Sequence, residues 1–253
     1  MTAVWSASYR RIVRSAFATV PLYRERWALD GREDPVVVPG KRGTDGGALG
    51  AGEMARKRVD LVPLAGGSAE FDPCRGLGPV LADARPAGRG TVVAVLDPAI
   101  RRPPADLPRG VRGCWLDSEA LPPAAMAELV STLRRNGKVI AVGPDKTLGM
   151  LTAALPEDVA ARVGAVPQRR LDELDGGPFG VLHDPALGYL GAFRDCGRWH
   201  VDWRNVFVRA TSGGLAFTVL TQRSPRLVDI LIAGGVRGRV EPCPRHGTPV
   251  VLT

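Results

Sequence analysis

Cysteine, histidine, lysine and aromatic residues are all scarce in this sequence. Four cysteines in 253 residues are too few for a disulfide framework, and a chain of this length can bury a core without one. Aromatic residues make up 6% of the chain, and only three histidines are present. No apolar run approaches the roughly 20 residues that cross a bilayer. These absences exclude a disulfide-stapled domain and a membrane-spanning helix, and we expect a cytoplasmic protein.

Arginine supplies most of the charge. Lysine and arginine together number 34 against 26 acidic residues, which gives a formal net charge of +8. The arginines are dispersed in ones and twos, without the clustered stripe and interleaved aromatics typical of nucleic-acid surfaces. We therefore do not expect nucleic-acid binding from charge alone, and an acidic protein or a phosphorylated ligand such as coenzyme A remains open as a partner.

The first 55 residues predict a helix followed by a mobile linker. Apolar residues between Val4 and Ala28 recur at helical spacing, and Pro21 interrupts the pattern. From Asp30 to Gly52 the sequence is rich in glycine, proline and polar residues without a sustained period.

Residues 56–175 predict an α/β portion. Short apolar, β-branched runs bounded by turn residues indicate strands buried on both faces, and amphipathic stretches between them indicate helices. Alternation of this kind predicts a partly parallel sheet with flanking helices. The expected strands are 59–64, 91–96, 113–116 and 138–142, and the expected helices are 121–135, 146–155 and 156–163.

Residues 176–253 predict an antiparallel, β-rich portion. Apolar and polar residues alternate on both sides of Ser212-Gly213-Gly214, which is typical of a hairpin, and residues 227–243 extend it. The predicted fold class is therefore α/β with an antiparallel, β-rich C-terminal region. We also expect a zinc ion to hold this region together, for the reason given next.

Two of the four cysteines pair with two of the three histidines at ligand spacing. Cys196 precedes His200 with three residues between, and Cys243 precedes His246 with two. Zinc prefers four tetrahedral sulfur and nitrogen ligands, and two short-spaced pairs would supply them. Four protein ligands leave no position for an activated water, so the sequence predicts a structural zinc. The alternative is that scarce residues fall together by chance, as buried cysteines and hydrogen-bonded histidines.

Four segments near the two ends of the chain carry a family resemblance. They are Val20-Pro21-Leu22-Tyr23-Arg24-Glu25-Arg26-Trp27, the Cys196 and His200 pair, 214–220 and Cys243-Pro244-Arg245-His246-Gly247-Thr248-Pro249. These segments resemble the phenylacetate-CoA ligases and the related coenzyme F390 synthetase-like proteins, which are adenylate-forming enzymes. The resemblance covers about thirty residues at the start and about seventy at the end, while the middle matches poorly. It implies a remnant of the large domain of such an enzyme, with His246 standing where family members have one of a late pair of zinc-binding cysteines.

The residues that adenylation needs are not matched. Three loops resemble a phosphate-binding loop only distantly, 41–47, 64–68 and 143–147, and Asp145 in the last is better explained as a helix cap. The resemblance puts His183 of the stretch 179–183 where the family has a magnesium-binding glutamate, and magnesium prefers oxygen ligands. Asp229 does not fall where the family's ribose-binding aspartate stands, and the chain ends near the family's hinge to its C-terminal lid. ATP and magnesium are therefore not expected.

The leading hypothesis is a truncated, non-adenylating relative that binds an acyl or aryl thioester, or an intermediate on an acyl carrier protein, in a bacterial biosynthetic pathway. Phe179, Gly180 and Asp184 are its candidate ligand-binding residues. A sheet that lacks its usual cover would favour a homodimer or docking on a pathway enzyme.

Two alternatives stay open. One is an enzyme of altered chemistry, in which His183 acts as general base on such an intermediate, or in which the zinc has lost a protein ligand and hydrolyses a substrate. The other is a zinc-containing nucleic-acid-binding or regulatory module, which would bind nucleic acid with a steep salt dependence.

Overall fold

The computed structural model describes residues 2–28, 47–97, 103–117, 120–135, 137–176 and 179–253. The chain forms two compact units: unit 1 combines Met1–Phe71 with Arg198–Thr253, and unit 2 is Asp72–Gly197. These boundaries differ from the three-part division expected from the sequence, because the two ends of the chain belong to one unit. No helix in the described ranges is long and apolar enough to cross a membrane.

Unit 2 contains the predicted parallel sheet, with strands in the order β7-β6-β5-β4-β2-β3. All neighbours are parallel except the pair of β6 and β7. The strands are β2 (Thr91–Val95), β3 (Arg112–Trp115), β4 (Lys138–Gly143), β5 (Val163–Arg169), β6 (Val181–Asp184) and β7 (Gly188–Phe193). The helices are α4 (Leu77–Ala84), α5 (Pro123–Arg134), α6 (Asp145–Ala154), α7 (Glu157–Ala160) and the 3-10 helix η3 (Leu171–Gly176).

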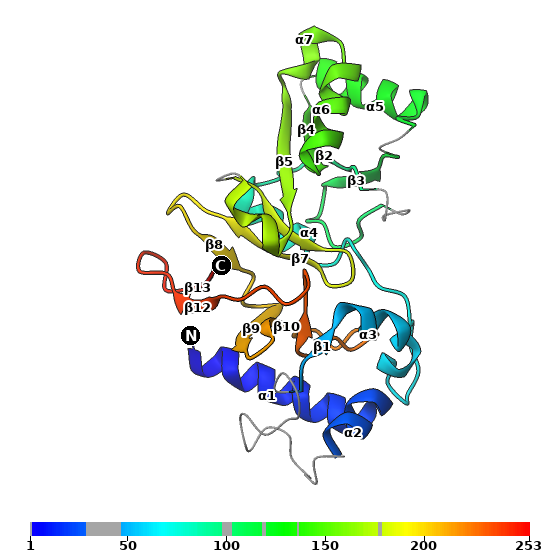
Figure 1. Cartoon of the computed structure of the whole chain (residues 1–253). Coiled ribbons are helices and arrows are strands. Elements are labelled where there is room, and N and C mark those ends of the chain that lie inside the picture. Colours follow the sequence, from blue (N-terminus) through cyan, green and yellow to red (C-terminus); the bar gives the residue numbers. More distant parts are fainter. Residues whose placement is uncertain (1, 29–46, 98–102, 118–119, 136, 177–178) are drawn as a thin grey trace. The chain divides into compact units, whose positions relative to one another are not determined.

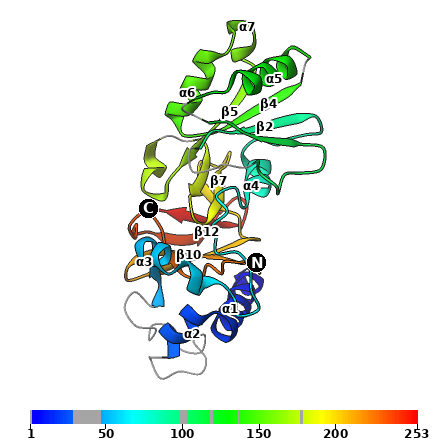
Figure 2. The ribbon, with the colours of Figure 1, turned by 90° about the vertical axis from the view of Figure 1, so that its right-hand side faces the viewer.

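The central strands of unit 2 are buried on both faces, as their unbroken apolar sequence predicts. Val93 and Val95 point to a core with α4, whereas Val92 and Ala94 point to a core with α5 and α6. Figure 2 shows α4 on one side of β2 and β4 and the pair α5 and α6 on the other. Period-2 alternation of side chains makes this possible, because successive residues of a strand face opposite sides of the sheet.

Unit 1 combines N-terminal helices with antiparallel strands from the C-terminal end of the chain (Figure 1). One sheet has the order β1-β11-β10-β9, and β12, β13 and β8 follow one another in antiparallel pairs. The helices are α1 (Thr2–Thr19), α2 (Pro21–Ala28), α3 (Ala51–Arg56) and the 3-10 helix η2 (Arg58–Leu61). The strands are β1 (Leu49–Gly50), β8 (Trp199–Val201), β9 (Val206–Thr211), β10 (Gly214–Val219), β11 (Ile230–Leu231), β12 (Arg239–Pro242) and β13 (Pro249–Leu252).

Aromatic residues attach α1 to the four-stranded sheet. Trp5 and Tyr9, one helical turn apart, both contact the ring of Phe207 on β9, with ring centroids 4.4 and 4.2 Å away. The Trp5 indole N–H donates to the Val206 carbonyl at 2.8 Å, which satisfies a donor that burial would otherwise leave unpaired. The apolar side of the helix predicted for this segment is therefore explained by packing on strands that lie about 200 residues later in the sequence.

Three sequence expectations need correction or limitation. The strand predicted at 59–64 is wrong: it begins with the 3-10 helix η2, and Pro63 cannot donate to a sheet. The helix predicted at 156–163 ends at Ala160, and β5, which the sequence analysis missed, follows it. Most of the expected linker 30–52 lies outside the described residues, and its last part forms β1 and the start of α3.

Candidate functional site

The hairpin turn between β12 and β13 carries the second ligand pair. The Cys243 N–H donates to the Thr248 carbonyl at 2.8 Å, and the Gly247 N–H donates to the Cys243 carbonyl at 2.7 Å. Gly247 has a φ of +64°, a left-handed conformation that glycine adopts without strain. This tight turn holds Cys243 Sγ 3.6 Å from His246 Nδ1, so both side chains are on one side of the loop.

Cys196 and His200 belong to the turn that leads into β8 and to β8 itself. The Gly197 N–H donates to the Arg194 carbonyl at 2.9 Å, which closes the turn around Cys196. His200 pairs with Val250 of β13 and is 2% exposed. Its Nδ1 lies 2.7 Å from Thr248 Oγ1. A hydrogen bond at one ring nitrogen orients the other toward a metal, so Nε2 is the candidate ligand atom.

The structure brings all four sequence-predicted side chains together. One candidate ligand atom from each of Cys196, His200, Cys243 and His246 lies within 4.8 Å of the others. Around tetrahedral zinc, bond lengths of about 2.0 to 2.3 Å give ligand separations of roughly 3.3 to 3.8 Å. The cluster therefore needs only a small contraction to bind a metal, and two sulfurs with two imidazole nitrogens form a donor set that suits zinc.

His183, the candidate general base, is buried on β6. It is 6% exposed, its Nε2 lies 2.9 Å from the Pro73 carbonyl, and its Nδ1 lies 3.8 Å from Asp97 Oδ2. Burial lowers the pKa of His183, and the Asp97 carboxylate opposes that effect. Both ring nitrogens face protein groups, so the geometry favours a positioning role over proton transfer to a bound molecule.

The three candidate ligand-binding residues lie at the two ends of β6. Gly180 has a φ of +142°, and a Cβ there would meet the Pro167 carbonyl oxygen at 2.4 Å, so close strand packing explains the glycine. Asp184 Oδ1 accepts hydrogen bonds from the backbone N–H groups of Ala186 and Leu187, which stabilises the turn to β7. Phe179 is 38% exposed, so it is the one of the three whose large apolar side chain reaches the surface.

The two described candidate phosphate loops use their polar groups internally. The Thr147 hydroxyl donates to the Pro144 carbonyl at 2.9 Å, and Asp145, the first residue of α6, forms an ion pair with Arg169. Ser68 Oγ accepts from the Glu70 N–H at 3.0 Å. These contacts suit ordinary helix starts and turns. The third loop, 41–47, lies outside the described residues apart from Gly47.

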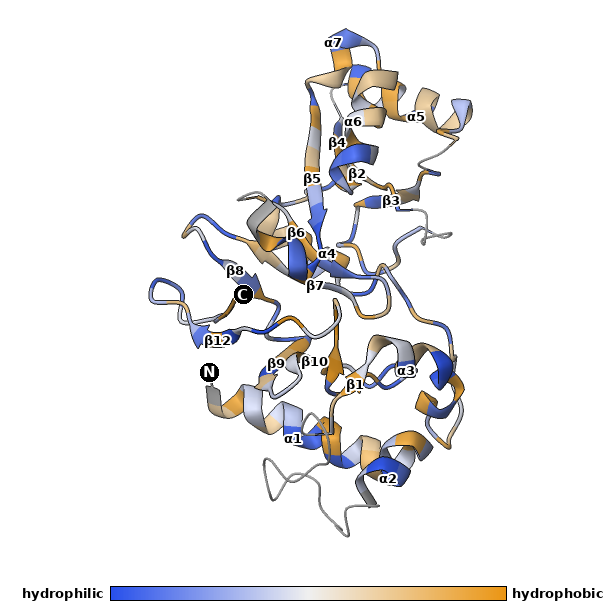
Figure 3. Cartoon of the chain, in the orientation of Figure 1, coloured by the Kyte–Doolittle hydropathy of each residue, from blue (hydrophilic) through white to orange (hydrophobic). Residues whose placement is uncertain are grey.

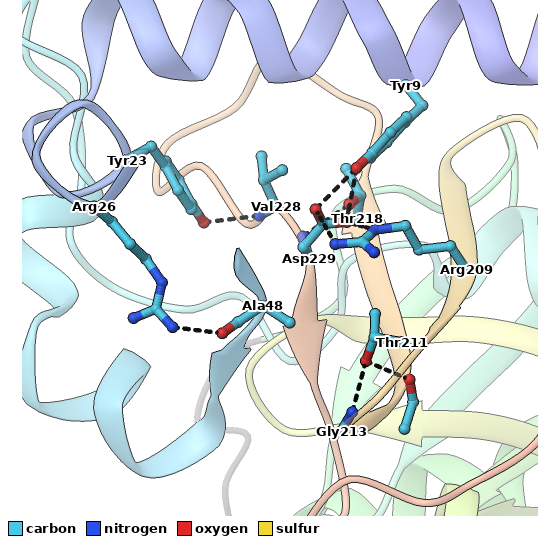
Figure 4. A network of polar contacts seen from close by, with 11 residues as sticks. Tyr9, Tyr23, Arg26, Ala48, Arg209, Thr211, Gly213, Thr218, Val228 and Asp229 are labelled. Atoms are coloured by element: carbon cyan, nitrogen blue, oxygen red, sulfur yellow. Dashed lines mark hydrogen bonds and ion pairs between the residues drawn. The ribbon is translucent and has the colours of Figure 1, made fainter. Parts of the chain in front are cut away.

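A buried polar network around Asp229 was not anticipated from the sequence (Figure 4). Asp229 is 0% exposed, and its carboxylate accepts hydrogen bonds from Arg209 at 2.9 and 2.8 Å and from the Tyr9 hydroxyl at 2.8 Å. The Thr218 hydroxyl also contacts it, at 3.3 Å. The available signal was a single carboxylate inside the apolar run 227–232, since a buried charge requires partners.

Comparison with known proteins identifies the fold. The sequence matches no protein-family model and no curated protein. Two solved structures of 2-hydroxyisobutyryl-CoA ligase are similar at 12% sequence identity, and each likeness covers 99% of this chain. The open conformation, in complex with 2-HIB-AMP and CoA, gives a TM-score of 0.63 over 73% of its chain. The structure of the thioesterification state gives a TM-score of 0.58 over 66% of its chain.

The chain has the fold of 2-hydroxyisobutyryl-CoA ligase. At 12% identity this likeness shows the fold and assigns the chain to no family. The segments 20–27, 214–220 and 243–249, which carry much of the sequence resemblance, all belong to unit 1, because unit 1 is built from both ends of the chain.

Proposed function

We propose that this protein binds an acyl or aryl thioester, free or on a carrier protein, without activating a carboxylate through ATP. In this proposal Cys196, His200, Cys243 and His246 hold a structural zinc that fixes the β12–β13 turn against β8. The carrying observation is the likeness to a CoA ligase fold across 99% of the chain. That ligase was solved in complex with 2-HIB-AMP and CoA, which supports a ligand that joins an acyl group to a thiol.

The environment of His183 supports the loss of nucleotide chemistry. The sequence resemblance aligns this residue with a magnesium-binding glutamate, and here the imidazole is buried between the Pro73 carbonyl and Asp97. An imidazole is a poor magnesium ligand, and burial favours its neutral form. The zinc would have a structural role when bound and not a catalytic one, because its four protein ligands leave no position for a substrate. Its contribution would be to stabilise the fold.

A ligand panel tests the thioester half of the proposal. Thermal unfolding of the purified protein is measured with acetyl-CoA, phenylacetyl-CoA and 2-hydroxyisobutyryl-CoA, and with free CoA and each free acid as controls. A thioester at about 100 times its Kd stabilises the native state by about 2.7 kcal/mol, which gives a clear shift in Tm. If no thioester stabilises the protein beyond free CoA, the thioester half is wrong.

Pyrophosphate exchange tests the nucleotide half. The protein is incubated with ATP, magnesium, labelled pyrophosphate and the same free acids. We expect no label in ATP above the level of a heat-denatured control. Exchange that depends on any one of the carboxylates would show that the protein does adenylate, and the nucleotide half would then be abandoned.

A further inference from the structure

The positive charge of the protein belongs to one unit. Unit 1 contains 19 lysine and arginine residues against 11 acidic residues, whereas unit 2 contains 15 of each. The formal net charge of +8 is therefore the charge of unit 1 alone. This difference in charge is not apparent along the sequence, because unit 1 is assembled from the two ends of the chain.

Much of this charge lies on the exposed side of the N-terminal helices. α1 contains three arginines and no acidic residue, and its middle is coloured as hydrophilic in Figure 3. α2 packs against both α1 and η2, and α3 packs against η2, so these elements are neighbours. We call the exposed basic residues that they contribute the arginine face: Arg10, Arg11, Arg14, Arg24, Arg56, Lys57 and Arg58.

An apolar hollow adjoins the arginine face where α1 meets α2. It has a volume of about 430 Å³ and is lined by Thr19, Val20, Pro21, Arg24, Glu25 and Leu64. Leu64 is 71% exposed, and Val59 on η2 is 68% exposed. An apolar centre with a charged rim is the usual anatomy of a protein–protein interface.

We propose that the arginine face and its hollow dock an acidic helical carrier domain, which brings the thioester to the protein; this rests on the proposed function. Arg10 and Arg14 are four residues apart and lie between Ala7 and Ala18 on the exposed side of α1. Small residues let a second helix approach closely, and arginines at this spacing match carboxylates that recur once per turn of that helix. The hollow would receive an apolar side chain of the carrier.

The packing of α1 disfavours the other polyanions. Trp5 and Tyr9 are turned into unit 1 against Phe207, so they offer no platform on which nucleic-acid bases could stack. Ile12 and Val13 are 1% and 0% exposed, so the apolar side of the helix is already buried and cannot enter a lipid surface. A folded acidic protein needs neither feature.

The test uses fluorescence anisotropy with a labelled apo acyl carrier protein, which lacks any acyl group. The variant Arg10→Gln/Arg11→Gln/Arg24→Gln removes three exposed charges from the arginine face. The matched control Arg109→Gln/Arg135→Gln/Lys138→Gln removes three exposed charges from unit 2. We expect roughly tenfold weaker carrier binding for the first variant and less than about a twofold change for the control, with binding that weakens as salt is raised.

Three results would overturn the proposal: no measurable carrier binding by the unaltered protein, equal weakening in both variants, or tighter binding of duplex DNA or of phosphatidylglycerol vesicles than of the carrier. Binding of an acyl-pantetheine, which has neither a carrier nor the phosphates of CoA, is measured in parallel. It should be unchanged in the arginine-face variant. If the unaltered protein does not bind the acyl-pantetheine, that result would instead count against the proposed function.

Discussion

Asp229 is a buried carboxylate at the centre of a polar network in unit 1. Its carboxylate is fully buried, and Arg209, Tyr9 and Thr218 all depend on it for hydrogen bonds. Removing one partner of a buried ion pair costs more than the pair itself is worth, because the remaining charge loses its compensation. The Tyr9–Asp229 hydrogen bond thus adds to the aromatic contacts that attach α1 to the sheet, and it needs the carboxylate.

We expect Asp229→Asn to lower the free energy of unfolding by about 3 to 5 kcal/mol. The amide cannot compensate the Arg209 guanidinium, whose side chain is only 24% exposed. Urea unfolding followed by circular dichroism measures the change. Asp60→Asn on the exposed surface of η2 is the matched control and should change stability by less than about 0.5 kcal/mol. Similar losses in the two variants would show that the network contributes little.

His183 gives a pH dependence whose sign follows from its burial. Burial lowers its pKa below the ordinary value of 6.5, so the unfolded chain binds more protons than the native state between the native pKa and 6.5. The contribution of His183 to stability is thus fully present above 6.5, falls as the pH drops toward the native pKa and is constant below it. The negative charges of Asp97 and Asp184 and the hydrogen bond to the Pro73 carbonyl raise the pKa of His183 and reduce the effect.

The variant His183→Gln should remove this dependence, because glutamine can donate to the Pro73 carbonyl without titrating. The difference in unfolding free energy between the unaltered protein and the variant should therefore shrink from about pH 8 to about pH 5. Urea midpoints at several pH values give this difference. A constant difference, or one that grows at low pH, would contradict the lowered pKa.

At the scale of single elements, the proposed zinc site predicts that the β12–β13 turn depends on a metal. Cys243→Ser should abolish binding of one zinc per chain, as measured by native mass spectrometry and elemental analysis, and a cobalt-loaded sample should lose its tetrahedral absorption bands. Cys114→Ser is the control. Burial raises the pKa of the Cys114 thiol to about 11, so it stays protonated at neutral pH, and its replacement should leave zinc loading intact. An unaltered protein that purifies without zinc and takes up none on titration would refute the metal site.

The elements that the sequence predicted well are those whose burial shows in local periodicity. The run 91–96 and the strand 138–142 are uninterrupted apolar stretches because helices cover both faces of their sheet. The run 59–64 also contains β-branched apolar residues, but it includes Asp60 and Pro63 and its first part belongs to η2, with Val59 exposed and η2 packed on α2. Its apolar residues alone do not predict this outcome, which the proline and the tertiary packing decide.

The ligand pairs were predictable for a different reason. Cys196 with His200 and Cys243 with His246 are scarce residues at short spacing, and the turns that hold them are local. The Asp229 network was not predictable, because Tyr9 lies 220 residues away from it in the sequence. In the local sequence, the only sign of this network is a single carboxylate among apolar residues.

At the scale of the whole molecule, the division into two units makes metal removal a selective perturbation. Three of the four candidate ligands, His200, Cys243 and His246, belong to unit 1, and they connect β8 with the β12–β13 hairpin. Unit 2 has a core of its own around β2 and β4, to which none of these residues contributes. Loss of the metal should therefore loosen one set of strands while the other keeps its hydrogen bonds.

Hydrogen exchange followed by mass spectrometry can resolve this difference. After treatment with a strong chelator, peptides from β8, β12 and β13 should exchange at least about tenfold faster, because structural zinc contributes folding free energy directly. Peptides from β2 and β4 should keep their protection, and zinc added back should restore the slow exchange of the first group. Uniform acceleration across both units would mean that the chain unfolds as one cooperative body, and unchanged exchange everywhere would mean that the four side chains need no metal to hold the turn.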